Sequence, residues 1–214
     1  MSLIDTLTQA VIAGDPEQAV EPARQALAAG FDPLDVINQG LVPGIQYTGE
    51  QFAAGEMFLP DLMLAAEAMQ RSIALLEPEM ARRGARRQVL GRVVIGTIQG
   101  DIHEIGKNLV ATLLSAGGFE VYDLGVDVSP LKFAEKARQV GADIVGVSAL
   151  LTTTMVRQKE VIEALEALGL RPATRVMVGG APVTRRWAEQ IGADGFSEDA
   201  LGAVQEAKKL MGIE

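Results

Sequence analysis

Helical periodicity alone marks the first part of the chain, residues 1 to 88. Apolar positions recur at the spacing of one helix face at Leu3, Ile4, Leu7 and Val11. Gly14 follows where such a helix would stop. Asp15-Pro16 and Asp32-Pro33 each have the pattern of an N-cap followed by proline in the first helical position. We therefore expect new helices to begin at both of these prolines.

Two other prolines and a charged segment limit the helices of this region. Pro22 and Pro43 lie where helix interiors are otherwise expected, so the pattern predicts kinks or breaks there. The last helix has the clearest apolar stripe, from near Pro60 to near Pro78 or somewhat beyond. Residues 81–88, with their arginines and a glycine, break the pattern on both sides and are the expected linker. We expect four or five short helices, packed as a small bundle, before this linker.

From residue 89 to residue 214 the rhythm changes to short apolar strands that alternate with helices. The candidate strands are 91–97, 120–123, 144–148, 175–178 and 195–196. The candidate helices lie near 105–116, 130–140, 155–168, 183–190 and 199–211. This alternation predicts an α/β domain with a doubly wound, five-stranded parallel sheet of the Rossmann or flavodoxin type. Ligands of such sheets bind beyond the carboxyl ends of the strands.

The composition excludes several kinds of binding site and reaction. The formal net charge is −9 and 48% of the residues are hydrophobic, so the chain can form a core but lacks the basic surface that binds nucleic acid. There is no cysteine and only one histidine, which excludes disulfides, thiolate metal sites, a cysteine nucleophile and a histidine-rich metal site. A metal ion would have to arrive mostly pre-ligated, inside a cofactor. No signal peptide or membrane-spanning run is evident, so we expect a cytoplasmic location and no membrane partner.

The single histidine, His103, stands in the stretch from Gly100 to Asn108, directly after the first candidate strand. Asp101 precedes it by two positions and Gly106 follows it by three. Neutral imidazole is the commonest protein metal ligand, and a ligating histidine usually donates its other N–H to an acceptor such as a carboxylate. The pattern therefore indicates one metal bond, with Asp101 as the acceptor behind it.

One other interpretation of this stretch stays open, and a second fails by a residue. Asp101 and Glu104 resemble a capping box, in which case His103 is a surface residue in the first turn of a helix. The stretch also comes close to a phosphate-binding loop. It has five residues instead of four between Gly100 and Gly106-Lys107, however, and an asparagine replaces the hydroxyl that would bind magnesium.

Two further segments follow strand ends, Ser148–Thr154 after the third strand and Gly179-Gly180-Ala181 after the fourth. Together with Asp101-x-His103-x-x-Gly106, they resemble the cobalamin-binding domain of cobalamin-dependent methionine synthase and of the free-standing corrinoid proteins of methyltransferase systems. The segment 55–61, which leads into the last bundle helix, resembles the helical cap of the same families. The resemblance covers nearly the whole chain in colinear order.

In these families cobalamin binds with its own dimethylbenzimidazole base removed from the cobalt. The resemblance implies that His103 takes the place of this base as the lower axial ligand, that Asp101 accepts the other N–H of the ring, and that Thr154 extends this relay. Ser148 and Thr152 match residues that contact the displaced nucleotide tail. No catalytic side chain is implied beyond the cofactor and this ligand relay. The other positions that the resemblance places at the cofactor are Gly100, Ile102, Glu104, Gly106, Leu150, Gly179 and Gly180.

Simpler explanations stay open for some of these positions. Gly179 and Gly180 also fit a plain turn after a strand, and Ser148 also fits a strand-end hydroxyl. Phe58 matches the cap segment that covers the upper, methyl-bearing face of the cofactor in the family. An apolar residue of this kind is more commonly part of an ordinary core.

The resemblance implies a corrinoid methyl carrier that is not catalytic alone. Cob(I)alamin on the protein would accept a methyl group held by a substrate-specific methyltransferase. Methylcobalamin would then pass it to a second methyltransferase that uses tetrahydrofolate or a similar acceptor. A reductive activase is a further implied partner, and other corrinoids would also fit as the cofactor. The methyl donor is not readable from the chain.

Three other classes are alternatives to a free-standing carrier: the small subunit of a mutase, a sensor or regulator, and a nucleotide binder without cobalamin, which the incomplete phosphate-binding motifs disfavour. The small cobalamin-binding subunit of a mutase shares the histidine motif but often lacks the cap. A cobalamin-dependent sensor or regulator adds a DNA-binding element, for which this acidic chain has neither the room nor the charge. A complete methionine synthase is excluded, because its zinc–thiolate site needs cysteine.

Overall fold

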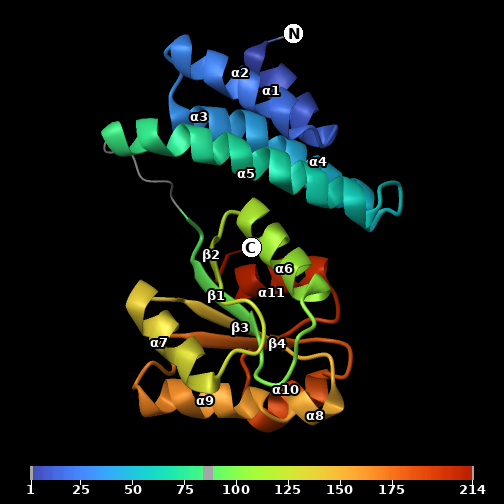
Figure 1. Ribbon diagram of the computed structural model, residues 1–214, viewed down its shortest axis with the longest axis vertical. Helices are drawn as coiled ribbons and strands as arrows, with labels where there is room; N and C mark the ends of the chain where they lie inside the picture. The colour runs from blue at the N-terminus through green and yellow to red at the C-terminus, as the bar shows by residue number, and fades with distance from the viewer. Residues whose placement is uncertain (1, 84–88, 214) are drawn as a thin grey trace. The chain divides into compact units, whose positions relative to one another are not determined.

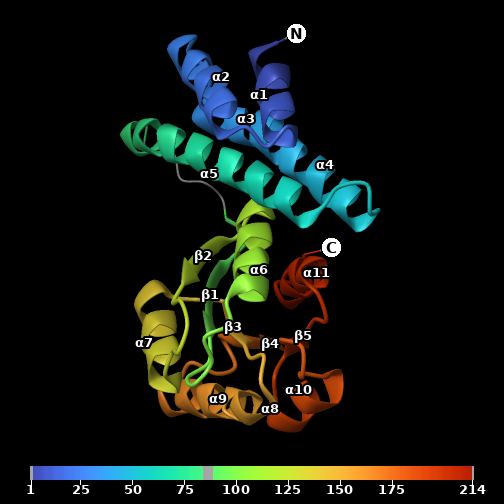
Figure 2. The same ribbon diagram turned by 45° about the vertical axis from the view of Figure 1, so that its right-hand side comes forward.

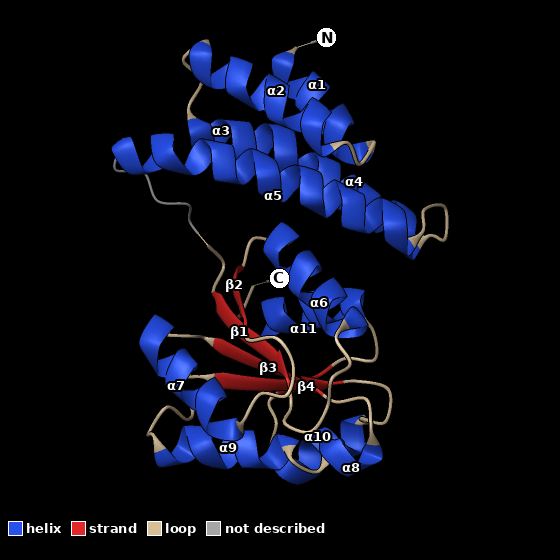
Figure 3. Ribbon diagram, viewed as in Figure 1, coloured by secondary structure: helices blue, strands red, loops and turns tan. Residues whose placement is uncertain are grey.

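The computed structural model describes residues 2–83 and 89–213, and the chain divides into two compact units, residues 1–88 and 89–214. The first unit is helical, and the second is a sheet covered by helices (Figures 1 and 3). Within the described ranges, no helix is both long enough and apolar enough to cross a lipid bilayer. Each unit buries its own apolar residues and is described by itself.

The first unit forms the helical bundle that the periodicity predicts. Its elements within residues 2–83 are α1 (Leu3–Ile12), α2 (Pro16–Ala28), α3 (Pro33–Val36), the π-helical turn η1 (Ile37–Leu41), α4 (Val42–Ala53) and α5 (Leu59–Arg82). The long helix α5 packs against all the other α-helices of the unit (Figure 2). Its buried stripe includes Leu62, Ala66, Met69 and Leu76, which recur at helical spacing.

The two aspartate–proline pairs begin helices, as predicted. Asp15 Oδ1 accepts a hydrogen bond from the backbone N–H of Gln18 at 2.9 Å. Asp32 Oδ1 accepts one from the N–H of Leu34 at 2.8 Å. Each carboxylate thus satisfies a donor that the first turn of a helix leaves free.

The prolines inside the bundle behave differently from each other. No break occurs at Pro22, because α2 continues through this residue, and of the two predicted outcomes only a kink is left. Pro22 is buried with three alanines of the same helix, and this packing outweighs the loss of one backbone hydrogen bond. At Pro43 the expected interruption is present. The helix widens into η1 just before it, where the N–H of Val42 bonds the carbonyl of Ile37.

The end of α5 lies further along the chain than Pro78. Ala81 and Arg82, which were expected in the linker, belong to this helix. Glu79 holds the last turn, because its carboxylate accepts from Arg82 Nε at 2.8 Å and from Arg83 Nε at 2.6 Å. The rest of the expected linker, residues 84–88, lies outside the described residues.

The second unit confirms the doubly wound, five-stranded parallel sheet. In the spatial order β2-β1-β3-β4-β5, all neighbours are parallel. The strands are β1 (Arg92–Thr97), β2 (Glu120–Asp123), β3 (Ile144–Ser148), β4 (Arg175–Gly179) and β5 (Gly195–Phe196). The helices are α6 (Ile105–Ala116), α7 (Pro130–Val140), α8 (Thr152–Met155), α9 (Gln158–Ala167), α10 (Arg185–Ile191) and α11 (Ala200–Leu210). The helix expected near 155–168 corresponds to α9, which begins three residues later, and the short α8 before it was not expected.

Helices cover both faces of the sheet (Figure 3). Residues of α7, α9 and α10 share one core with the sheet, in which Phe133 and Leu165 are fully buried. Residues of α6 and α11 share the other, around Leu114 and Ala207. From β1 the chain continues to β2 on one side, and β3 lies on the other side. The topological switch point therefore lies beyond the carboxyl ends of β1 and β3, where ligands of such sheets bind.

Candidate functional site

The loop between β1 and α6 places an imidazole at this switch point. His103 Nδ1 and Asp101 Oδ1 lie 2.7 Å apart. The His103 side chain is 47% exposed, whereas that of Asp101 is fully buried. An ionised carboxylate only accepts hydrogen bonds, so in the neutral ring Nδ1 carries the hydrogen and Nε2 keeps its lone pair. The arrangement leaves Nε2 as the nitrogen that can bind a metal ion.

The Asp101 carboxylate joins two separate segments of the chain, its own loop and residues 150–154. Besides the imidazole, its carboxylate accepts from Thr154 Oγ1 at 2.7 Å and from the backbone N–H groups of Leu150 at 2.8 Å, Leu151 at 3.3 Å and His103 at 3.1 Å. Burial by itself raises the pKa of Asp101. The hydrogen bonds from Thr154, His103 and Leu150 outweigh burial and hold this pKa well below its usual range. The carboxylate is therefore ionised at neutral pH.

The same contacts exclude a capping box. α6 begins at Ile105 with Glu104 as its N-cap, and no side chain makes a cap hydrogen bond there. The contacts also account for α8, because Leu151 and Thr154 tie this short turn back to Asp101. The three residues of the expected relay are thus brought together in one hydrogen-bonded chain.

A phosphate-binding role for Lys107 is not supported. Its side chain is buried, and its ammonium group lies 2.5 Å from Asp123 Oδ2 at the end of β2. A second oxygen, Asn108 Oδ1, also lies 2.5 Å from the ammonium nitrogen. These partners anchor the start of α6 to β2 and occupy the ammonium group of Lys107, so that it is not available to a nucleotide phosphate.

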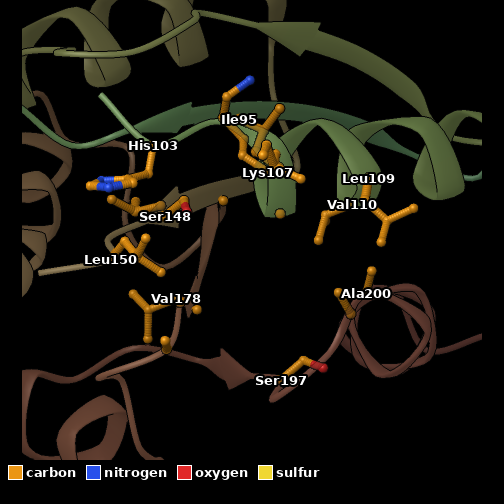
Figure 4. A pocket seen from close by; sticks show the side chains of 18 of the residues that line it. Ile95, His103, Lys107, Leu109, Val110, Ser148, Leu150, Val178, Ser197 and Ala200 are labelled. Atoms are coloured by element: carbon orange, nitrogen blue, oxygen red, sulfur yellow. The ribbon is translucent and has the colours of Figure 1, made fainter. Parts of the chain in front are cut away.

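A pocket of about 670 Å³ opens beside the histidine (Figure 4). Leu109 and Val110 of α6 form one wall, and Ser197 and Ala200 stand on the opposite side. His103 lies at one end of the pocket. The residues expected at the cofactor that line it are Ile102, His103, Glu104, Gly106, Ser148, Leu150, Gly179 and Gly180.

Four expected positions do not line this pocket. Gly100 and Asp101 lie behind the histidine in the same loop, and Thr152 is exposed at the start of α8. Phe58 belongs to the first unit, where it is the N-cap of α5 and 69% exposed. The interpretation of Phe58 as ordinary core is therefore wrong.

Most of the pocket wall was not identified from the sequence. The additional lining residues are Ile95, Ile105, Lys107, Leu109, Val110, Gly146, Val147, Met177, Val178, Ala181, Ser197, Glu198, Asp199, Ala200 and Ala203. Most are apolar or small and come from the sheet, α6 and α11. Apolar periodicity marks them only as core candidates, because a pocket wall and a core have the same pattern.

The glycines of the pocket serve different purposes. Gly180 has φ +120°, and an added Cβ would collide with the carbonyl oxygen of Ala149. Glycine is therefore required there by the backbone itself. Gly106 also lines the pocket, but an added Cβ there would meet no protein atom within 4 Å, so the protein itself does not require glycine at this position.

The donor set fits a pre-ligated metal. In the described part of the chain no three histidine, cysteine or acidic side chains gather to hold an ion. The protein offers one imidazole nitrogen, framed by Ile102, Ile105 and Leu150, which are 75%, 77% and 41% exposed. A corrin ring supplies its own equatorial nitrogens and needs an apolar support and one axial ligand. The exposed apolar frame and the adjoining pocket match these needs.

The comparisons with known proteins agree with this chemistry. Two family models, each described as a B12 binding domain, match residues 91–205 and residues 3–77. The chain is 48% identical to a corrinoid protein of Desulfitobacterium hafniense, over 99% of both chains. It is 52% identical to a trimethylamine corrinoid protein of Methanosarcina acetivorans, over 91% of this chain and 89% of the relative.

A solved structure has the same fold over nearly the whole chain. This is the methanol:cobalamin methyltransferase complex of Methanosarcina barkeri, with a TM-score of 0.90 and 32% identity. The match covers 98% of this chain and 80% of the matched chain. The chain has a helical unit and a B12 binding domain with a lone histidine at the switch point of its sheet, and its relatives are corrinoid proteins. The chain is therefore a member of the corrinoid proteins of methyltransferase systems.

Proposed function

We propose that this corrinoid methyl carrier holds cobalamin, or a closely related corrinoid, through His103 Nε2 as the lower axial cobalt ligand. The observation that carries the proposal is the buried Asp101 carboxylate, which lies 2.7 Å from Nδ1 of the same ring. It fixes the tautomer and the ring orientation, and it makes Nε2 the nitrogen available to cobalt. The pocket beside the histidine is the proposed place of the displaced nucleotide tail.

When bound, the corrinoid supplies the cobalt centre at which a methyl group is accepted and given away. The residues of the chain supply ligation, orientation and exclusion of water. Asp101, kept ionised by its hydrogen bonds, accepts the hydrogen on Nδ1 of His103 and so strengthens the ring as a metal ligand. Thr154 donates its hydroxyl hydrogen to the far oxygen of the same carboxylate and fixes its direction.

For the remaining expected positions we propose roles of support. Ile102 and Leu150 lie beside the imidazole and would pack against the ring of the cofactor. Ser148 and Gly179 line the pocket and would contact the tail, whereas Thr152 would contact it only from the exposed start of α8. For Phe58 we propose the role that the resemblance implies, contact with the methyl-bearing face, supported by its exposure of 69%.

We infer that the partners are a substrate-specific methyltransferase and a second methyltransferase that removes the methyl group. The relatives favour a methylated amine as the donor, because their names include trimethylamine and dimethylamine corrinoid proteins at 43–52% identity. The complex named for methanol is less similar, at 32%. A reductive activase is proposed as a third partner, since oxidised cobalt needs an electron to return to its reactive state. A cytoplasmic location suits this redox requirement.

The experiment that tests this function uses the single histidine of the chain. Protein grown on ¹⁵N is mixed with unlabelled hydroxocobalamin, passed through gel filtration and reduced to the Co(II) form for electron paramagnetic resonance. We expect retained red colour and doublet hyperfine splitting from ¹⁵N of His103. His103→Ala should lose the doublet. Triplet splitting from the cofactor's own ¹⁴N base in the wild type, or a colourless eluate, would overturn the proposal.

A further inference from the structure

The segment after β2 holds a residue in an unusual backbone conformation. Asp127 has φ +53° and is the non-glycine residue with a positive φ among the described residues. Aspartate adopts this left-handed region more readily than most residues, but it persists there only where its surroundings fix it. Its position opposite the histidine loop shows what fixes it.

Asp127 makes two hydrogen bonds to the loop that carries His103. Its Oδ1 accepts a hydrogen bond from the backbone N–H of Gly100 at 2.7 Å. Its own backbone N–H donates to the carbonyl of Asp101 at 3.0 Å. Asp127 therefore binds the loop on both sides of the backbone unit that carries the Asp101 carboxylate.

Residues next to Asp127 and at the end of β1 hold the same loop through further backbone contacts. The N–H of Val128 donates to the carbonyl of Thr97 at 3.0 Å, and Ile98 and Val128 form a parallel bridge. Thr97 Oγ1 in turn donates to the carbonyl of His103 at 2.8 Å. The loop is thus fixed before and after Asp101 by groups that are outside the cofactor pocket.

Without Asp127 the backbone of the loop would be free to change its conformation at Gly100. Gly100 has φ +87° and, as a glycine, can exchange this conformation for others at little cost. The carboxylate of Asp127 holds the N–H of Gly100 in the direction that the observed conformation requires. A change of the Gly100 backbone would move Asp101, and with it the imidazole that Asp101 orients.

We propose that Asp127 is a positioning residue for the cobalt ligand. It sets the place of Asp101 and therefore of the His103 ring, so that Nε2 already points outward when the cofactor arrives. The inference rests on the proposed ligand role of His103. It concerns a residue that touches neither the metal ligand nor the pocket.

The test uses three variants at this position and one matched control. Asp127→Gly keeps the left-handed backbone without strain but removes the acceptor, and Asp127→Ala removes the acceptor in a strained backbone. Asp127→Asn keeps an acceptor oxygen for the N–H of Gly100. The control is Asp143→Ala, which removes a carboxylate that accepts the N–H of Arg92 at 2.7 Å, at the other end of β1.

We expect Asp127→Gly and Asp127→Ala to weaken hydroxocobalamin binding by about 10-fold or more, the size typical of groups that orient a metal ligand. In the ¹⁵N-labelled Co(II) form, the fraction with a histidine doublet should fall. Asp127→Asn should restore both values, and Asp143→Ala should leave both unchanged while lowering thermal stability. Glycine and alanine variants with wild-type affinity and a full doublet would refute the inference. Loss of the doublet in the wild type itself would instead refute the ligand role of His103.

Discussion

Thr154 Oγ1 lies 2.7 Å from Asp101 Oδ2, although 53 residues separate the two in sequence. The contact joins the turn after β3 to the loop after β1, the two loops that diverge at the switch point. Asp101 uses its other oxygen for the imidazole. A hydroxyl on one loop therefore orients a carboxylate whose opposite oxygen orients the proposed cobalt ligand on the other.

Removing this hydroxyl should destabilise the second unit. Thr154→Val keeps the shape of the side chain but leaves a buried carboxylate with one donor fewer, at a cost of about 1.5–3 kcal/mol in the free energy of unfolding. Thr154→Ser should retain most of the stability because it keeps the donor. Urea unfolding followed by the fluorescence of Trp187, the one tryptophan of the chain, reports on this unit. Equal stability of the valine variant and the wild type would contradict the prediction.

The effect of Thr154→Val should depend on pH. The folded-state pKa of Asp101 is lowered, so the stability that this group contributes is present above its unfolded pKa of about 3.9 and is lost as the pH falls toward the folded value. The unfolded state is the same in both proteins, so the difference in unfolding free energy between wild type and Thr154→Val should be largest near pH 7 and should shrink only as the pH falls through the folded-state pKa of Asp101 in the variant. A difference that is larger at pH 3 than at pH 7 would show that the hydroxyl does not act through the ionised carboxylate.

Gly180 should tolerate no side chain, whereas its neighbour should. Gly180→Ala places a Cβ against the carbonyl oxygen of Ala149 in a backbone region that alanine avoids, so it should destabilise the unit by about 1–3 kcal/mol or more and weaken cobalamin binding. Gly179→Ala is the matched control, because its Cβ would stand 3.5 Å from Ser197 O, an ordinary contact. Denaturant unfolding of the two apoproteins checks this, and cobalamin titration is compared with wild type for Gly180→Ala alone, because Gly179 lines the pocket. Similar losses for the two would argue against a backbone requirement specific to Gly180.

Gly106→Ala should separate stability from cofactor binding. Alanine is the better helix residue in α6, so the apoprotein should gain about 0.5–1 kcal/mol in unfolding free energy. The added methyl group points into open space at the edge of the pocket and should weaken hydroxocobalamin binding. Opposite signs in thermal unfolding of the apoprotein and in cofactor titration are the expected result. If binding is unchanged, the cofactor does not use the space beside Gly106.

Much of the fold follows from local patterns. The expected strands agree with the observed ones within one residue at each end, because short apolar runs between turn residues have few other ways to be buried. Whether a proline ends a helix is harder to predict from the sequence. Pro22 lies inside α2 since its neighbours on the buried face hold the helix, which is a property of packing and not of the proline.

Local sequence patterns were enough to predict the helical unit, the parallel sheet and the pair of His103 and Asp101, because a strand end, a loop and a two-residue spacing are local features. The partnership with Thr154 came from family resemblance. The pocket walls on α6 and α11, the ion pair of Lys107 and the hydrogen bonds of Asp127 to the loop are visible only in the folded chain. The physical reason is that these contacts join segments distant in sequence, and their geometry depends on how the crossovers place the loops at one edge of the sheet.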